Sequence, residues 1–116
     1  NDENFVSKLI TGIDKLGYNA KAVSTGRDGL NTIINHSFDL VFIEVFLPDG
    51  MGYDFIPEFR EKLPGLKVVA MTANNSKKTE LRVREHNVMS YMIKPFGNRE
   101  LKIIIDHIEK TSGRVE

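Results

Sequence analysis

The sequence contains no cysteine, so disulfide bonds, cysteine-ligated zinc and cysteine nucleophiles are excluded. It also lacks an excess of either charge, because 16 lysine and arginine residues balance 16 aspartate and glutamate residues. A surface for nucleic acid or for an anionic membrane needs clustered basic residues, and no basic run occurs. No apolar run approaches the roughly 18 residues that a membrane-spanning helix requires. We therefore expect a soluble, cytoplasmic protein that binds neither nucleic acid nor membrane.

Length and composition favour one globular domain. A chain of 116 residues can bury a core of its own, and 41% hydrophobic residues is an ordinary share for a soluble protein. No internal repeat or low-complexity segment interrupts the chain. We predict a single domain over residues 1–110, followed by a tail or the start of a linker at residues 111–116.

Apolar residues recur at helical spacing in five segments of the chain. Gly17 is typical of the position just after a helix end, and Ser76 is a typical helix cap. We also expect Asn98 to cap the last helix. The predicted helices cover residues 3–16, 26–36, 52–63, 77–86 and 98–110.

Four segments between these helices favour strands. Residues 18–25 alternate in polarity and contain β-branched residues, which is typical of a half-buried strand. Leu40 to Ile43 are continuously apolar, which is typical of a parallel strand covered on both faces. Residues 67–73 and 90–95 complete the set. Alternating helices and strands predict an α/β fold with a parallel sheet, right-handed crossovers and helices on both faces.

Polar residues stand at the carboxyl ends of three predicted strands: Glu44, Thr72 and Lys94, the last directly before Pro95. Neighbouring strands lie about 5 Å apart, so these side chains can converge on one pocket. An acid, a hydroxyl and an ammonium suit phosphoryl chemistry, with Glu44 as acceptor and the other two stabilising phosphoryl oxygens. We expect an ion pair between Glu44 and Lys94. The purely structural alternative for Glu44 is a half-buried acid that backbone amides satisfy.

Three pieces of sequence are specific when taken together: residues 39–52, 71–73 and 91–96. In their order and spacing they resemble the receiver domain of two-component response regulators, and the resemblance extends over essentially the whole chain. It implies a flavodoxin-like doubly wound parallel sheet with strand order 2-1-3-4-5. It also implies a regulatory domain rather than an enzyme, in which a histidine kinase donates a phosphoryl group to an aspartate at the position of Glu44.

Glu44 departs from the family pattern at that position. The extra methylene of glutamate moves the carboxylate outward by about 1.5 Å, and phosphoryl transfer depends on in-line placement at that scale. We therefore predict an atypical receiver, or pseudo-receiver, that has lost self-phosphorylation and dephosphorylation. We expect Glu44 to mimic the phosphorylated acid by pairing with Lys94 and Thr72.

The amino terminus departs from the family pattern as well. Receivers begin with an apolar strand that ends in two acids holding Mg²⁺, and by spacing Asn1 falls on the position of the second acid. We expect either that the natural protein has residues ahead of Asn1 or that a partner chain supplies the strand, and we favour the first. The metal ligands that remain are Glu44, the carbonyl of Phe46 and Asp2, so we expect Mg²⁺ to bind weakly. No other cofactor site is predicted.

The resemblance also assigns a switch to Thr72 and Tyr91, in which the hydroxyl moves toward the phosphoryl group and the ring turns inward. The alternative for Tyr91 is an edge-strand aromatic with its hydroxyl in water. We expect signalling through the surface built from the helix at 77–86, the strand at 90–95 and the last helix. The implied partners are a histidine kinase or another signalling protein, a C-terminal effector domain and a second copy of the chain on that surface.

Two other functions are compatible with these residues. The first is a working, Mg²⁺-dependent receiver in which Glu44 accepts the phosphoryl group. The second is a flavin- or nucleotide-binding flavodoxin-like protein, although no glycine-rich phosphate loop follows a strand here. The three histidines, His36, His86 and His107, are interpreted as solvated surface residues.

Overall fold

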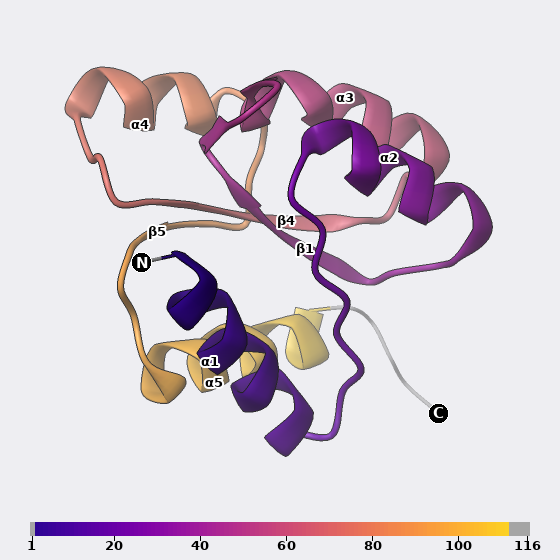
Figure 1. Cartoon of the computed structure of the whole chain (residues 1–116), viewed down its shortest axis with the longest axis vertical. Helices are drawn as coiled ribbons and strands as arrows, with labels where there is room; N and C mark the ends of the chain where they lie inside the picture. Colours follow the sequence, from indigo (N-terminus) through magenta and orange to yellow (C-terminus); the bar gives the residue numbers. More distant parts are fainter. Residues whose placement is uncertain (1, 112–116) are drawn as a thin grey trace. The chain divides into compact units, whose positions relative to one another are not determined.

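The computed structural model describes residues 2–111, with the side chains of residues 3–109. Contacts divide the chain into two compact units, a larger one of residues 23–94 and a smaller one of residues 1–22 with 95–116. The helices are α1 (Asp2–Lys15), α2 (Gly26–Asn35), α3 (Gly52–Lys62), α4 (Lys77–Arg84) and α5 (Asn98–Thr111), and the strands are β1 (Leu40–Glu44), β2 (Phe46–Leu47), β3 (Gly50–Met51), β4 (Lys67–Thr72) and β5 (Ser90–Ile93) (Figure 1).

The larger unit contains a parallel sheet with the order β1-β4-β5. β4 is the central strand, and every residue from Val68 to Thr72 is buried. Glu44 of β1 pairs with Met71, and Thr72 pairs with Ile93 of β5. Because parallel strands run in one direction, this register brings their carboxyl ends to the same edge of the sheet.

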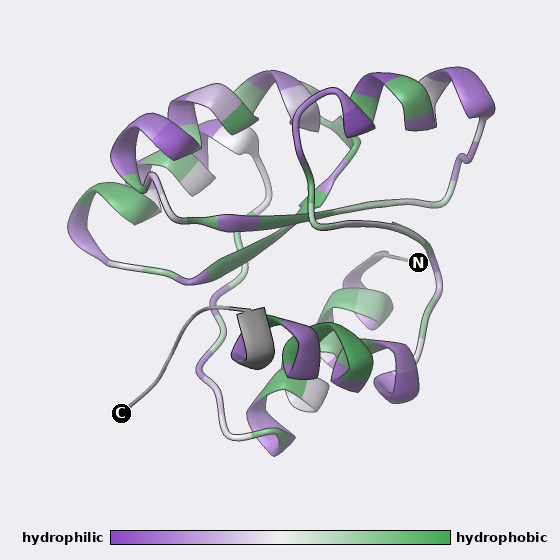
Figure 2. Cartoon of the chain, turned by 180° about the vertical axis from the view of Figure 1, so that it is seen from behind, coloured by the Kyte–Doolittle hydropathy of each residue, from purple (hydrophilic) through white to green (hydrophobic). Residues whose placement is uncertain are grey.

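Helices α2, α3 and α4 lie along one face of this sheet (Figure 1). α3 contacts β1 and β4, and α2 packs against α3. Figure 2 shows hydrophobic residues gathered along the strands, whereas each helix carries residues of both kinds. Burial of each large apolar side chain contributes roughly 1.5–3 kcal/mol, so the core dominates the stability of this unit. The buried cluster consists of Leu30, Ile33, Ile43, Val45, Ile56, Phe59, Leu66, Val68, Ala70 and Val83.

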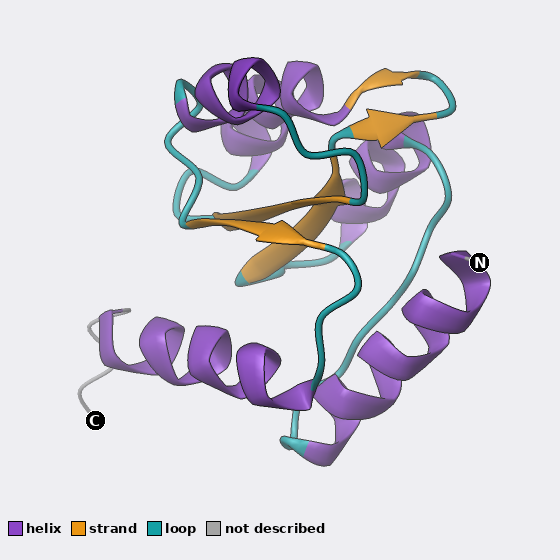
Figure 3. Cartoon of the chain, turned by 90° about the vertical axis from the view of Figure 1, so that its left-hand side faces the viewer, coloured by secondary structure: helices purple, strands orange, loops and turns teal. Residues whose placement is uncertain are grey.

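Residues 46–51 form an antiparallel hairpin of β2 and β3, separate from the parallel sheet, which was not predicted (Figure 3). Its turn is Pro48-Asp49, and the following Gly50 has a φ of 143°, which L side chains rarely adopt. Strands this short carry no periodic pattern, so the sequence indicated only a loop with Pro and Gly at these positions.

Helices α1 and α5 pack against each other in the smaller unit. α1 is followed by Gly17 with a φ of 91°, as predicted for a helix end. Gly12 lies inside α1 where α5 approaches, and a Cβ atom there would lie 2.5 Å from Oδ1 of Asn98. The rings of Phe5 and Phe96 meet edge to face, with centroids 5.0 Å apart. A glycine that lowers helix propensity is thus needed for the contact between the two helices.

Residues 18–25 do not form the predicted strand, and that prediction is wrong. They are irregular chain that leads from α1 into α2. A strand is stable only when its backbone groups pair with a neighbouring strand. Within the part of the chain that the structure describes, β1 has a strand partner on one side only, which is β4. Residues 18–25 pair with no strand among the described residues, so their alternating pattern does not produce a strand.

The other predicted elements form within two residues of their expected bounds. Ser76 caps α4 as predicted, because its hydroxyl oxygen accepts from the amide of Thr79. Asn98 is the first residue of α5 rather than its cap. The carboxylate of Glu100 accepts from the amide of Gly97 instead, at 3.0 Å.

The tail was predicted to begin at residue 111, but α5 extends to Thr111. Residues 112–116 of the predicted tail lie outside the described residues. No helix in the described range is both long and apolar enough to cross a membrane.

Candidate functional site

Glu44 and Lys94 form the ion pair predicted from the sequence. Glu44 ends β1 and Lys94 follows β5, and the Lys94 ammonium donates to Oε2 of Glu44. The side chain of Lys94 is 5% exposed and that of Glu44 is 22% exposed. The Lys94 amide donates to the carbonyl oxygen of Thr72 at 2.8 Å, so the central strand sets the position of the lysine. Because a buried ammonium is stable only with a partner, this pair is the electrostatic centre of the site.

Thr72 lies at the end of β4 and is 1% exposed. Its hydroxyl oxygen accepts from the amide of Asn74 at 3.0 Å, which turns the chain away from the sheet. A hydroxyl that accepts one bond can still donate its proton. The structure therefore places Thr72 beside the ion pair by register, whereas its bond to a phosphoryl oxygen or to Glu44 stays a prediction.

The predicted metal ligands do not make a magnesium site in the part of the chain that the structure describes. Glu44 contributes one carboxylate, and that carboxylate contacts Lys94. Phe46 lies in β2 with its side chain 48% exposed, and only its backbone carbonyl would serve. The side chain of Asp2 lies outside the described residues. Among those described, no three His, Asp or Glu side chains lie close enough to hold a metal ion, and Mg²⁺ requires an octahedral shell of oxygens.

Tyr91 lies on β5, an edge strand of the sheet, and its hydroxyl has an exposed hydrogen-bond partner, so both interpretations of this residue stay predictions. The hydroxyl donates to Oδ1 of Asn75 at 2.9 Å. Its half-buried ring lies below the guanidinium of Arg84, at 5.8 Å from the ring centroid. Asn75 directly follows Asn74, which binds Thr72. Both predicted switch residues thus bond to neighbouring positions of the loop between β4 and α4.

We predict that Tyr91 ionises at higher pH than an ordinary tyrosine. Burial raises its pKa above 10.0 and the Glu80 carboxylate adds to the effect, whereas Arg84 opposes it. Because the pKa of Tyr91 is higher in the folded than in the unfolded chain, its protonated phenol adds to the free energy of unfolding. This contribution is complete below pH ~10 and is lost as pH rises through the folded pKa. An ultraviolet tyrosinate titration should show a late step that Tyr91→Phe removes and Tyr53→Phe leaves in place. A single step common to all tyrosines would contradict this prediction.

His86 is not the solvated residue that was predicted. Its ring stacks on Tyr53 of α3 with centroids 5.4 Å apart. The guanidinium of Arg60 donates to the backbone carbonyls of His86 and Asn87, the latter at 2.9 Å. Asn87 has a φ of 61°, which asparagine tolerates better than most residues. These contacts join α3 to the end of α4, while the other two histidines are exposed as predicted.

Asp49 in the hairpin turn was not identified from the sequence. Its carboxylate oxygens accept from the amides of Gly26 and Arg27, each at 3.0 Å. These bonds lower the pKa of Asp49 below 3.8, the Arg27 amide most and the Gly26 amide next. The sequence indicates this role only weakly, because an acid in a turn is common. Nothing in the position of Asp49 indicates a contact with amides 22 and 23 residues earlier in the chain.

The fold and the site together define a class of protein. A parallel sheet with helices against it, and with an acid and a buried lysine at its carboxyl edge, is typical of open α/β domains that carry their site at that edge. A family model described as the response regulator receiver domain matches residues 1–106, and the chain belongs to this family. It is a receiver domain of the two-component response regulators, as the sequence predicted.

The relatives agree with this assignment. A probable C4-dicarboxylate response regulator, DctR of Halalkalibacterium halodurans, is 32% identical over 112 residues, which cover 97% of this chain and 46% of the relative. The chain thus spans about half the length of that relative. A regulatory protein LuxO of Vibrio cholerae is 29% identical over 81% of this chain, which covers 21% of it.

Solved structures confirm the fold. A CheY-like receiver domain protein of Methanospirillum hungatei JF-1 has a TM-score of 0.87 at 22% identity, covering 98% of this chain and 92% of that protein. This likeness shows the flavodoxin-like fold alone. The BeF3-activated receiver domain of DrrB, a Thermotoga maritima protein, has a TM-score of 0.83 at 28% identity, covering 94% of this chain and 91% of that domain.

Proposed function

We propose that this chain is an atypical receiver in which Glu44 occupies the place of the phosphoacceptor and signals through its pairing with Lys94. The observation that carries the proposal is the ion pair between an acid and a nearly fully buried lysine at the ends of β1 and β5. A lysine in that position stabilises added negative charge on the acid beside it. Glu44 brings its charge one methylene further toward solvent than aspartate would, as a phosphorylated acid also does.

The two switch residues supply a route from this site to the protein surface. Thr72 and Tyr91 bond to Asn74 and Asn75 in one loop, so a displacement of either side chain acts on the start of α4. We propose that α4 and β5 belong to the output surface. Leu81 of α4 and Ile93 of β5 are 58% and 43% exposed, and a partner on this surface would cover them. On this proposal the partners are a histidine kinase or another signalling protein, an effector domain joined to the chain, and a second copy.

The proposal is tested by comparing the chain with Glu44→Asp in a titration with beryllofluoride and Mg²⁺, followed by amide NMR. Any amino-terminal strand that precedes Asn1 is restored in both proteins, so that the acids expected to hold Mg²⁺ are present. We expect a response only in Glu44→Asp, at the amides of Thr72, Asn75 and Tyr91, because aspartate restores the in-line position of the carboxylate. Glu44→Asp combined with Lys94→Ala is the matched control and should lose the response.

The other outcomes contradict the proposal in different ways. A response in the unaltered chain would show that Glu44 is a working phosphoacceptor. A response in neither protein would show that Glu44 is not what prevents phosphorylation. The amide resonances of Tyr91 and α4 can also be compared in the chain and in Glu44→Asp before any titration. If they are identical, the idea that Glu44 mimics an activated state is contradicted.

A further inference from the structure

The first amides of α2 are satisfied by two residues that lie far apart in the sequence. The hydroxyl of Thr25 accepts from the amide of Asp28 at 3.0 Å, as an ordinary N-cap does. The carboxylate of Asp49 accepts from the amides of Gly26 and Arg27, each at 3.0 Å. The next amide already donates within the helix, to the carbonyl of Thr25. Asp49 therefore supplies two of the three bonds that the start of this helix needs.

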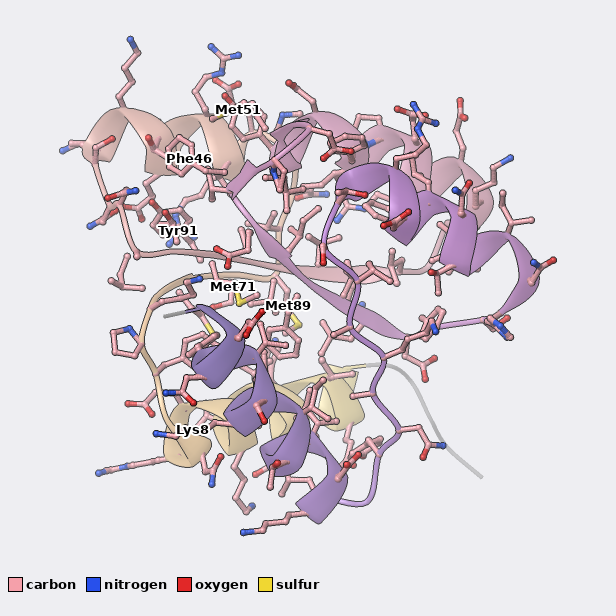
Figure 4. All side chains as sticks on the ribbon, in the orientation of Figure 1. Lys8, Phe46, Met51, Met71, Met89 and Tyr91 are labelled. Atoms are coloured by element: carbon pink, nitrogen blue, oxygen red, sulfur yellow. The ribbon has the colours of Figure 1, made fainter. Side chains whose placement is uncertain are left out.

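Asp49 stands at the tip of the hairpin that directly follows Glu44. The base of this hairpin is closed by the amide of Gly52, which donates to the carbonyl of Val45 at 2.7 Å. Its two strands pair Phe46 with Met51, whose side chains lie near each other at the end of the sheet (Figure 4). With its base and its tip both held, the hairpin has little freedom, and the residues just after Glu44 share that restraint.

The packing around Asp49 agrees with a built contact. The ring of Phe55 in α3 lies against Gly26, and any Cβ atom at position 26 would overlap that ring. The same ring would lie 3.8 Å from a Cβ atom at Gly50, beside Asp49 in the hairpin. Glycine at position 26 thus lets α2 approach closely enough for its amides to reach the carboxylate. A carboxylate at the amino-terminal end of a helix is further stabilised by the helix dipole.

We propose that Asp49 is a positioning residue that ties the loop after Glu44 to the start of α2, so that the two respond together. A displacement of the amino terminus of α2 then shifts Phe46 and its neighbours, and a change of charge or length at Glu44 reaches Gly26 and Arg27. Such coupling is reciprocal by thermodynamic necessity. A change at the start of α2 would thus reach the Glu44 site. The coupling itself does not depend on the proposed function, whereas its role in signalling rests on that function.

The test uses amide NMR and hydrogen exchange on the intact protein and on three variants, Asp49→Ala, Asp49→Asn and Asp54→Ala. In Asp49→Ala we expect exchange of the Gly26 and Arg27 amides to rise about tenfold or more, because two charge-assisted bonds are lost. Asp49→Asn keeps one carbonyl oxygen and should restore one of the two. Asp54→Ala removes an exposed acid from the first turn of α3 and should change neither amide.

The coupling itself is measured from both ends. Thr25→Ala should shift the amide resonance of Phe46, and Glu44→Gln should shift the amide resonances of Gly26 and Arg27. Both shifts should occur when Asp49 is present and should be absent when the same changes are made in Asp49→Ala. Shifts that persist without Asp49, or that never occur, would overturn the proposal even if Asp49 caps the helix. Unchanged exchange in Asp49→Ala would remove its basis. No readout involves phosphoryl transfer, so the result stands apart from the titration of Glu44→Asp.

Discussion

Gly52→Ala is expected to destabilise the protein by about 3 kcal/mol, the upper part of the usual range for overpacking. A Cβ atom on residue 52 would overlap the backbone carbonyl oxygen of Glu44, and it would also crowd Cγ1 of Ile43 at 3.2 Å. The opposing atom belongs to the backbone of β1, so no side-chain rotation relieves the overlap. A domain of this size has a free energy of unfolding of roughly 5–15 kcal/mol, so the loss would be a large fraction of it.

The clash has a consequence for the site as well as for stability. Relief requires the amide of Gly52 to leave the carbonyl of Val45, to which it donates at 2.7 Å. That step opens the base of the hairpin and displaces Glu44 from Lys94. We therefore expect the amide resonances of residues 44–52 to move together.

Chemical denaturation checks this expectation, with Gly65→Ala as the matched control. A Cβ atom at Gly65 would meet nothing within 4 Å, and this glycine does not have the positive φ that strains other residues. The control should therefore stay within about 0.5 kcal/mol of the unaltered protein. Equal shifts in the midpoints of the two variants would contradict the prediction. Circular dichroism shows whether Gly52→Ala is folded before its midpoint is compared.

Lys94→Met is expected to cost about 3 kcal/mol, because it removes one partner of a buried ion pair. The estimate lies at the lower end of the range for such pairs, since the side chain of Glu44 is 22% exposed and keeps some contact with water. Methionine fills much the same volume as lysine, so the loss reports the charge rather than a cavity. The free energy of unfolding from urea denaturation measures it.

The double variant Glu44→Gln with Lys94→Met separates the interaction from the effects of each side chain. Replacing both charges by neutral groups is expected to cost clearly less than the sum of the single changes, with an interaction energy of at least about 1 kcal/mol. Simple additivity would show that the two groups do not stabilise each other. Lys102→Met, on an exposed pair with Asp106, is the control and should change stability by less than about 1 kcal/mol.

The helices and the parallel strands were largely predictable, for a physical reason. Burial of an apolar stripe or run dominates their formation, and periods of 3.6 residues or continuous apolar runs are visible in the sequence. The ends were predictable where a local bond makes them, as with Ser76 at α4 and Gly17 after α1. Glu44 and Lys94 were placed together because strands of one parallel sheet end at one edge.

The failures share a different cause. Residues 18–25 have the composition of a strand, but a strand needs a partner, and the sequence of a segment does not say whether its partner is present. His86 was interpreted as solvated because it lies near a helix end and far from the other histidines, whereas its ring stacks on Tyr53 of another helix. In both cases the deciding interaction is with a residue distant in the chain.

The sequence by itself determined the class of fold, the receiver family and the three polar residues at the strand ends, because all of these follow from local patterns. Only the tertiary structure decided that the oxygen of Thr72 accepts from the amide of Asn74, that Tyr91 bonds to Asn75, and that Asp49 caps a helix far ahead of it. Hydrogen bonds act over about 3 Å, and which donors come within that distance of an acceptor depends on how the elements pack. A pattern in one segment carries no information about that distance.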